Sequence, residues 1–98
     1  MSKPIEHYVQ VIIRRSALTD ELRAGFLGLY DKVRDQIPGF LSDQVAFLED
    51  GPGETCAVCH RMVFADEAAL TAFKTCGEHL AHRAYVSAAA IETNIRDF

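Results

Sequence analysis

The sequence predicts an α+β protein with the ferredoxin-like split βαβ topology, a four-stranded antiparallel sheet that carries both of its helices on one face. The first observation behind this prediction is the order of the periodic segments: strand, helix, strand, strand, helix, strand. The second is that the first strand is apolar on both faces, which is typical of a strand covered on both sides. Because the helices cover one sheet face, we expect a second copy of the chain to cover the other in a two-fold homodimer.

The first strand is expected over residues 7–14, and its side chains alternate between two largely apolar faces. One face carries His7, Val9, Val11 and Ile13, and the other carries Tyr8, Gln10, Ile12 and Arg14.

The first helix is expected to begin at Leu18–Leu22, with Thr19 or Ser16 as its N-cap, and to end at Pro38-Gly39. Apolar side chains recur along it every three or four residues, which predicts one buried stripe. The stripe consists of Leu22, Phe26, Leu29, Tyr30, Val33 and Ile37.

The remaining elements follow from alternation, caps and turn residues. Strands are expected over residues 43–49, 55–64 and 91–98, with a turn at residues 50–53. Asp66 can cap the second helix, residues 75–78 interrupt it, and a further helix is expected from His79 to about Ala90.

Length and composition exclude several classes of protein. The 98 residues suit one domain, residues 1–98, and a formal charge of −4 argues against a nucleic-acid partner. No apolar run is long enough to cross a membrane, and the N-terminus lacks the apolar core of a secretory signal. Three cysteines, an odd number, form a poor disulfide framework, so we expect a reduced, cytoplasmic protein.

The segment Cys56-Ala57-Val58-Cys59-His60 has the spacing of a c-type haem attachment motif. It falls within an expected strand, where Cys56 and His60 would face one way and Cys59 the other. We therefore interpret both cysteines as structural residues, with no haem and no metal. Cys76, near His79, could be nucleophilic, although an isolated cysteine is more often inert.

Two imidazoles lie three residues apart near the start of the last helix, at His79 and His82. The topology returns this helix over the sheet near one end of the first strand, so we expect His7 and His82 to meet between helix and sheet. A buried neutral imidazole there could take a proton from a carbon acid or a hydroxyl. A metal would need a third ligand, such as His7 or Glu78, and nothing in the sequence demands one. The structural alternative is that these imidazoles cap and line a helix end.

Five short motifs are spread over nearly the whole chain in one register. They are His7-Tyr8-Val9, Ile37-Pro38-Gly39, Val63-Phe64-Ala65-Asp66, His79-Leu80-Ala81-His82 and Asp97-Phe98.

On these motifs the chain resembles the stress-responsive A/B barrel family, in the dimeric α+β barrel superfamily. The resemblance implies a homodimer whose two sheets form a dimeric α+β barrel. Leu80 replaces the usual Pro of the fourth motif, and residues 74–78 form a longer segment than usual. In the plant polyketide cyclases of the family the second His of that motif is the base. The resemblance therefore implies His82 as base and His7 as a second pocket histidine, while Phe73 stands where those cyclases have their catalytic Tyr.

We therefore expect a small cytoplasmic homodimer that binds a small organic ligand between helices and sheet, with cofactor-free, cyclase-like acid–base catalysis as a candidate activity. His82 and His7 are the candidate catalytic residues, with His82 the better candidate for the base. The candidate ligand contacts are Tyr85, Phe73, His79, Phe26 and Tyr30. One alternative is a non-catalytic, stress-linked oligomer, which a pocket filled by the aromatic residues would favour. The other is a cofactor-independent oxygenase.

Overall fold

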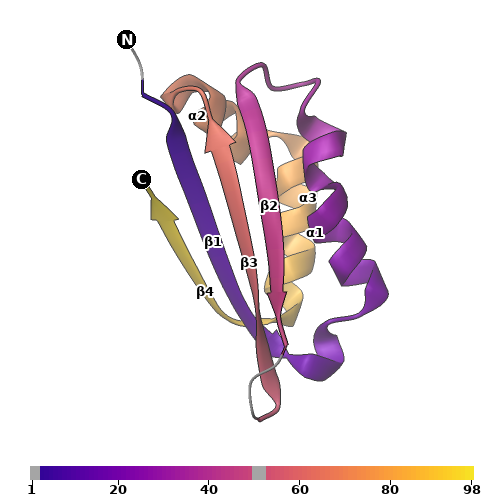
Figure 1. Cartoon of the computed structure of the whole chain (residues 1–98). Helices are drawn as coiled ribbons and strands as arrows, with labels where there is room; N and C mark the ends of the chain where they lie inside the picture. Colours follow the sequence, from indigo (N-terminus) through magenta and orange to yellow (C-terminus); the bar gives the residue numbers. More distant parts are fainter. Residues whose placement is uncertain (1–2, 50–52) are drawn as a thin grey trace.

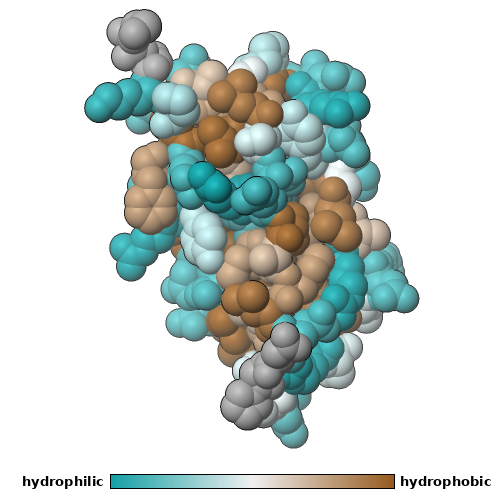
Figure 2. Space-filling view, viewed as in Figure 1, coloured by the Kyte–Doolittle hydropathy of each residue, from teal (hydrophilic) through white to brown (hydrophobic). Residues whose placement is uncertain are grey.

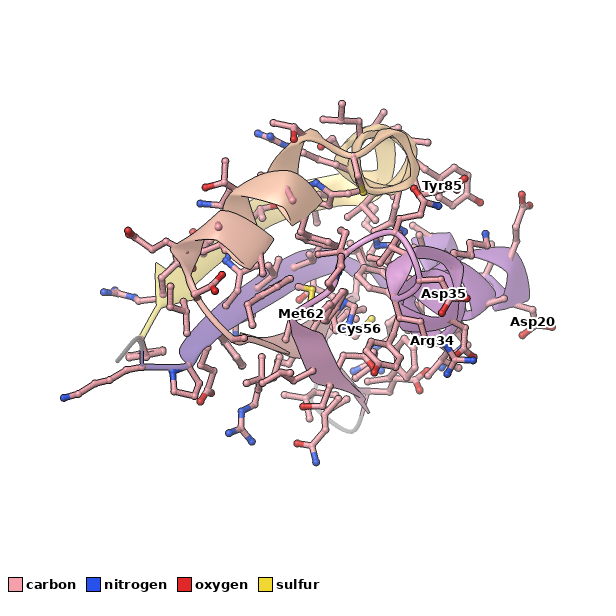
Figure 3. All side chains as sticks on the ribbon, turned by 90° about the horizontal axis from the view of Figure 1, so that it is seen from above. Asp20, Arg34, Asp35, Cys56, Met62 and Tyr85 are labelled. Carbon is pink, nitrogen blue, oxygen red and sulfur yellow. The ribbon has the colours of Figure 1, made fainter. Side chains whose placement is uncertain are left out.

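A computed structural model of the chain describes residues 3–49 and 53–98. Four antiparallel strands form one sheet in the spatial order β2-β3-β1-β4, and helices lie against one of its faces (Figures 1 and 3). The strands are β1 (Ile5–Arg14), β2 (Phe40–Leu48), β3 (Thr55–Phe64) and β4 (Ala90–Asp97). The helices are a 3-10 turn η1 (Arg15–Ala17) and the α-helices α1 (Asp20–Val33), α2 (Glu67–Thr75) and α3 (Gly77–Ala89). This arrangement confirms the predicted ferredoxin-like fold.

β1 is the strand that sets the register of the sheet, because it pairs with β3 on one side and β4 on the other. On the helix side, side chains opposite one another form rows across the four strands. The first row is Asp43, Met62, His7 and Asp97; the second is Val45, His60, Val9 and Ile95; the third is Phe47, Val58, Val11 and Thr93. The face predicted to carry His7 with Val9, Val11 and Ile13 is therefore the face under the helices.

The core lies between this face and the helices and consists of two apolar clusters. Near the His7 end, the fully buried rings of Phe64 and Phe73 lie 5.2 Å apart, and Phe40 stacks on Phe64 at 4.5 Å. Burying each such ring stabilises the fold by about 1.5–3 kcal/mol relative to leaving it in water. Leu22, Phe26, Leu29 and Val33 complete the core from α1.

The first helix is shorter than the sequence predicted, since α1 ends at Val33 rather than at Pro38-Gly39. Pro38 disfavours helical backbone at the residue before it, so the helix must end upstream. After the helix, the backbone N–H of Gln36 donates a hydrogen bond to the Val33 carbonyl in a turn. Ile37 is still buried, at 2% exposure. The predicted stripe therefore remains in the core although its last residue lies in a turn.

Each of the three α-helices has an N-terminal cap, a side chain that accepts a hydrogen bond from a backbone N–H group. Thr19, rather than Ser16, caps α1, and Asp66 caps α2 as predicted. The Cys76 sulfur accepts the His79 amide at 3.4 Å, so α3 begins at Gly77, two residues before the predicted start at His79. The turn predicted at residues 50–53 lies almost entirely outside the described residues.

The opposite face of the sheet has no described helix over it (Figures 1 and 3). It carries apolar and polar side chains together, and Figure 2 shows hydrophobic patches between hydrophilic ones on this side. One row consists of Leu48, Ala57, Ile12 and Glu92. Leu48 is 54% exposed in the single chain. One copy of the chain therefore leaves this apolar surface in water.

The turn into β2 requires a glycine, so Gly39→Ala should lower the free energy of unfolding by at least about 1 kcal/mol. Gly39 has φ +101°, and a Cβ there would lie 3.0 Å from that of Ala69. The matched control is Gly28→Ala, because a Cβ at this site in α1 meets nothing within 4 Å. That control should stabilise the protein by up to about 1 kcal/mol. Urea unfolding of both variants measures the difference, and equal stabilities would contradict the prediction.

Candidate functional site

A cavity of about 520 Å³ lies between the helix-side face of the sheet and the three α-helices. The chain has four histidines, and all four line this cavity: His7, His60, His79 and His82. We call it the histidine cavity. Most of its other walls are apolar, and they include Met62, whose side chain lies in the layer between sheet and helices (Figure 3). Lys74 and Arg83 add two cationic side chains to the lining.

His7 comes from β1 and is paired with a carboxylate. It is 4% exposed, and its Nδ1 lies 2.5 Å from the Asp97 Oδ1, directly opposite in the strand register. A carboxylate accepts, so His7 donates from Nδ1 and its Nε2 keeps the lone pair when the ring is neutral. Among the described residues no protein group bonds to Nε2. The second oxygen of Asp97 lies 3.8 Å from the Lys74 Nζ. This His7–Asp97 pair can therefore present a fixed acceptor nitrogen to a ligand.

His60 comes from β3 and forms a second such pair. It is 2% exposed, and its Nε2 lies 2.7 Å from the Asp43 Oδ2. Burial lowers the pKa of His60, although the bond to Asp43 opposes that shift. The ring is therefore neutral at pH 7, with its proton on Nε2 beside Asp43.

His82 and His79 come from α3 and have no carboxylate partner among the described residues. Burial is the main cause that lowers the pKa of His82 to about 4, and repulsion from His60 and His79 adds to it. The His82 ring meets the Phe26 ring edge-on, with the centroids 4.8 Å apart. His79 donates from Nδ1 to the Lys74 carbonyl at 3.3 Å, and burial lowers its pKa as well. Both rings are therefore neutral at pH 7.

The structure brings together five of the seven candidate site residues named from the sequence. His7, His82, His79, Phe26 and Phe73 all line the histidine cavity. The expected convergence of His7 and His82 on one pocket is confirmed as geometry, whereas their roles remain predictions. The aromatic residues form part of the walls and do not fill the space.

Tyr30 and Tyr85 do not line the histidine cavity. The Tyr30 ring packs on Phe40 at 4.9 Å, and its hydroxyl donates to the Leu41 carbonyl at 3.2 Å. Tyr85 is 44% exposed on the outside of α3 (Figure 3). It precedes Val86 by one residue, so the helix turns it by about 100° from the face that lines the cavity.

Sequence reasoning missed three residues of the site: His60, Asp43 and Asp97. Strand alternation could have indicated His60, since it shares a face with the buried Val58 and Met62. The two carboxylates carry no local signal, because only the pairing of distant strands brings them to their histidines.

The predicted alternation of the cysteine motif is confirmed. Cys56 packs in the helix-side core with Val58, whereas Cys59 lines a groove with Tyr8 on the open face of the sheet. The thiols therefore lie on opposite sides of the sheet. Within residues 3–49 and 53–98, no group of three metal-ligating side chains is close enough to hold an ion.

The sequence matches no protein-family model and no curated protein. Solved structures are similar over nearly the whole chain. Rv0793 from Mycobacterium tuberculosis has a TM-score of 0.81 at 18% identity, covering 98% of this chain and 93% of that one. A candidate antibiotic biosynthesis monooxygenase from Caulobacter crescentus has a TM-score of 0.80 at 18% identity, covering 99% and 89%. A variant of SnoaB, a cofactor-independent oxygenase from Streptomyces nogalater, has a TM-score of 0.78 at 13% identity, covering 99% and 92%.

At these identities the similarity establishes the fold and no activity. The similar structures include dimeric ferredoxin-like proteins of unknown function, for example from Bacteroides fragilis and Jannaschia. The chain thus has the ferredoxin-like α+β fold that monooxygenase-type proteins and dimeric proteins of unknown function also have. None of its described helices is long and apolar enough to cross a membrane.

Stability should fall as the pH falls from about 6.5 to about 4, because His82 has its pKa lowered from 6.5 to about 4 in the folded state. In that window the unfolded chain binds more protons than the folded chain, which favours unfolding. His82→Gln should reduce the difference between unfolding free energies at pH 7 and pH 5. Tyr85→Gln, on the outside of the same helix, should leave it unchanged. If the difference were undiminished in His82→Gln, His82 would already be protonated at pH 5 in the folded protein, as it is in the unfolded chain.

Proposed function

We propose that this protein is a homodimer that binds a small, largely apolar organic acid in the histidine cavity and removes a proton from it without a metal or cofactor. The single observation behind this proposal is that every histidine of the chain lines one cavity with otherwise mostly apolar walls. A neutral imidazole that faces the cavity can accept a proton from a bound ligand. The five sequence motifs support a protein of the stress-responsive A/B barrel type, and its free thiols suit a reduced, cytoplasmic setting.

The surroundings of the rings favour His7 over His82 as the base. A general base works best when its pKa lies near the working pH, and a pKa of about 4 makes His82 a weak proton acceptor. His7 donates to Asp97, and that carboxylate can stabilise the imidazolium that forms. We therefore assign proton removal to the Nε2 of His7, and we assign to His82 a contact with the bound ligand.

Cationic side chains at the same cavity would stabilise the anion left by proton removal. The Lys74 ammonium lies beside Asp97, close to the proposed base. Arg83 also lines the cavity, and within the described residues it forms no ion pair. A ligand whose proton is removed beside His7 would thus find positive charge nearby.

A second candidate function is a cofactor-independent oxygenase. The structural similarity to SnoaB, which is such an enzyme, favours it. In this case dioxygen would react with the anion that His7 produces, so the first step is shared. Consumption of dioxygen during turnover would distinguish oxygenation from proton transfer or cyclisation alone.

The exposed apolar surface of the open sheet face supports dimerisation through that face. Ile12, Ala57 and Leu48 lie in one row there, and a second copy would remove them from water. Dimeric proteins of the same fold give this arrangement further support. The two sheets would then form the barrel, and each histidine cavity would lie outside it, under the helices of its own chain.

The wild-type protein should sediment as a dimer at micromolar concentration, with at least about 1,200 Å² buried in total. Leu48→Glu should give a monomer, because two carboxylates would be buried between the sheets. Leu27→Glu is the matched control: Leu27 is 58% exposed on α1 and Leu48 is 54% exposed on the sheet. A dimer lost with Leu27→Glu and kept with Leu48→Glu would place the interface on the helices.

A thermal-shift screen of apolar compounds with an acidic C–H or O–H group should find a ligand, and single substitutions then test the base. His7→Asn places an amide near the old Nδ1, which can still bond to Asp97, but it removes the Nε2. It should lower kcat by about 10²- to 10⁴-fold, the usual contribution of a general base. His82→Gln should raise KM with a smaller effect on kcat. The reverse order of effects would assign the base to His82, as the sequence predicted, and a dimer lost in either variant would indicate a structural role.

A further inference from the structure

His60 is a buried titratable residue that the proposed proton transfer does not use. It belongs to the cysteine–histidine motif, whose cysteines lie on opposite sides of the sheet. It is 2% exposed, yet it lines the histidine cavity. Buried polar atoms are normally hydrogen-bonded, so the partners of both ring nitrogens of His60 have to be accounted for.

Only one ring nitrogen of His60 has a protein partner. Nε2 donates to Asp43 at 2.7 Å, since a carboxylate only accepts. Nδ1 has no partner among the described residues. Within those residues no fully hidden side-chain nitrogen or oxygen is without a hydrogen-bond partner. Nδ1 is therefore not fully hidden, and the space it borders is the histidine cavity.

His60 and His7 are neighbours on the sheet side of the histidine cavity, which we call its floor. His60 lies opposite Val9 in the register, and His7 lies opposite Met62, so the two histidines are diagonal neighbours on β3 and β1. Such positions are about 7–8 Å apart. Each ring is held by its own carboxylate, from β2 for His60 and from β4 for His7. The floor thus presents two oriented acceptor nitrogens, Nδ1 of His60 and Nε2 of His7.

We propose that His60 is a ligand-binding residue whose Nδ1 accepts a hydrogen bond from a second O–H or N–H group of the ligand. This inference rests on the proposed function, in which His7 engages the first such group. The ligand class is then an apolar body with two hydrogen-bond donors on its surface. Ligands with ether or carbonyl oxygens in place of the donors are disfavoured, because a lone pair of His60 would face another lone pair.

Isotope-edited NMR of uniformly ¹⁵N-labelled protein tests the acceptor without any ligand. At pH 7 the His60 Nε2 should carry the ring proton and Nδ1 should carry none. A proton on Nδ1 would overturn the inference, because His60 would then present a hydrogen-bond donor to the cavity.

Three probes with the same ring and with two, one or no hydrogen-bond donors test binding: 1,4-dihydroxybenzene, 4-methoxyphenol and 1,4-dimethoxybenzene, titrated under argon. Loss of each hydrogen bond should weaken binding by about five- to tenfold. His60→Gln places an amide near the old Nε2, which can still donate to Asp43, but it removes the Nδ1. His60→Asn retains a polar atom near Nδ1 and loses the reach to Asp43.

In His60→Gln the diol should bind no more tightly than its monomethyl ether, whereas His60→Asn should retain part of the preference for the diol. Equal binding of diol and monoether by the wild type, or a full preference retained in His60→Gln, would overturn this inference and leave proton removal by His7 standing. If none of the three probes bound the wild type, the proposed ligand class would fail and the inference with it. Circular dichroism and the dimer state of each variant verify that the fold is intact.

Discussion

The pairing of β1 with both of its neighbours is the constraint on which the rest of the structure depends. Its register places His7 opposite Asp97 on one side and, one row further along, Val9 opposite His60 on the other. A shift of one residue would turn every side chain of the strand to the other face. The apolar residues that share a face of the strand with His7 oppose such a shift, because Val11 and Ile13 would leave the core. The hydrophobic pattern that fixes the fold therefore also fixes the geometry of the site.

Two kinds of imidazole result from this arrangement. His7 and His60 lie on the sheet, where neighbouring strands supply carboxylates that hold each ring in one orientation. His79 and His82 lie on α3, where burial beside aromatic rings lowers their pKa values. Burying a charged group without a partner is costly, so the helix rings stay neutral at pH 7, whereas each ring on the sheet has a carboxylate beside it. The cavity therefore combines oriented acceptors on the sheet side with neutral helix imidazoles, two cationic side chains and largely apolar walls.

Fold and chemistry are separate questions for this protein. Similar structures include an oxygenase and dimeric proteins of unknown function, and a shared fold does not transfer an activity between them. The chemistry proposed for this chain rests on the content of its cavity, where four imidazoles, Lys74 and Arg83 lie among mostly apolar side chains. These residues, rather than the sheet that carries them, define which ligands and which chemistry the proposals invoke.

The sequence by itself determined the element order, the bounds of β3, the cap at Asp66, and the face on which His7 lies, and it narrowed the cap of α1 to Thr19 or Ser16. These features are local, since alternation, capping and helical spacing act within a few residues. The tertiary structure alone decided that Tyr30 and Tyr85 lie away from the cavity, and that Asp97 and Asp43 meet His7 and His60. Asp97 stands ninety residues from His7 along the chain, and only strand pairing brings the two together. Contacts of that range depend on register and helix rotation, and no local pattern encodes them.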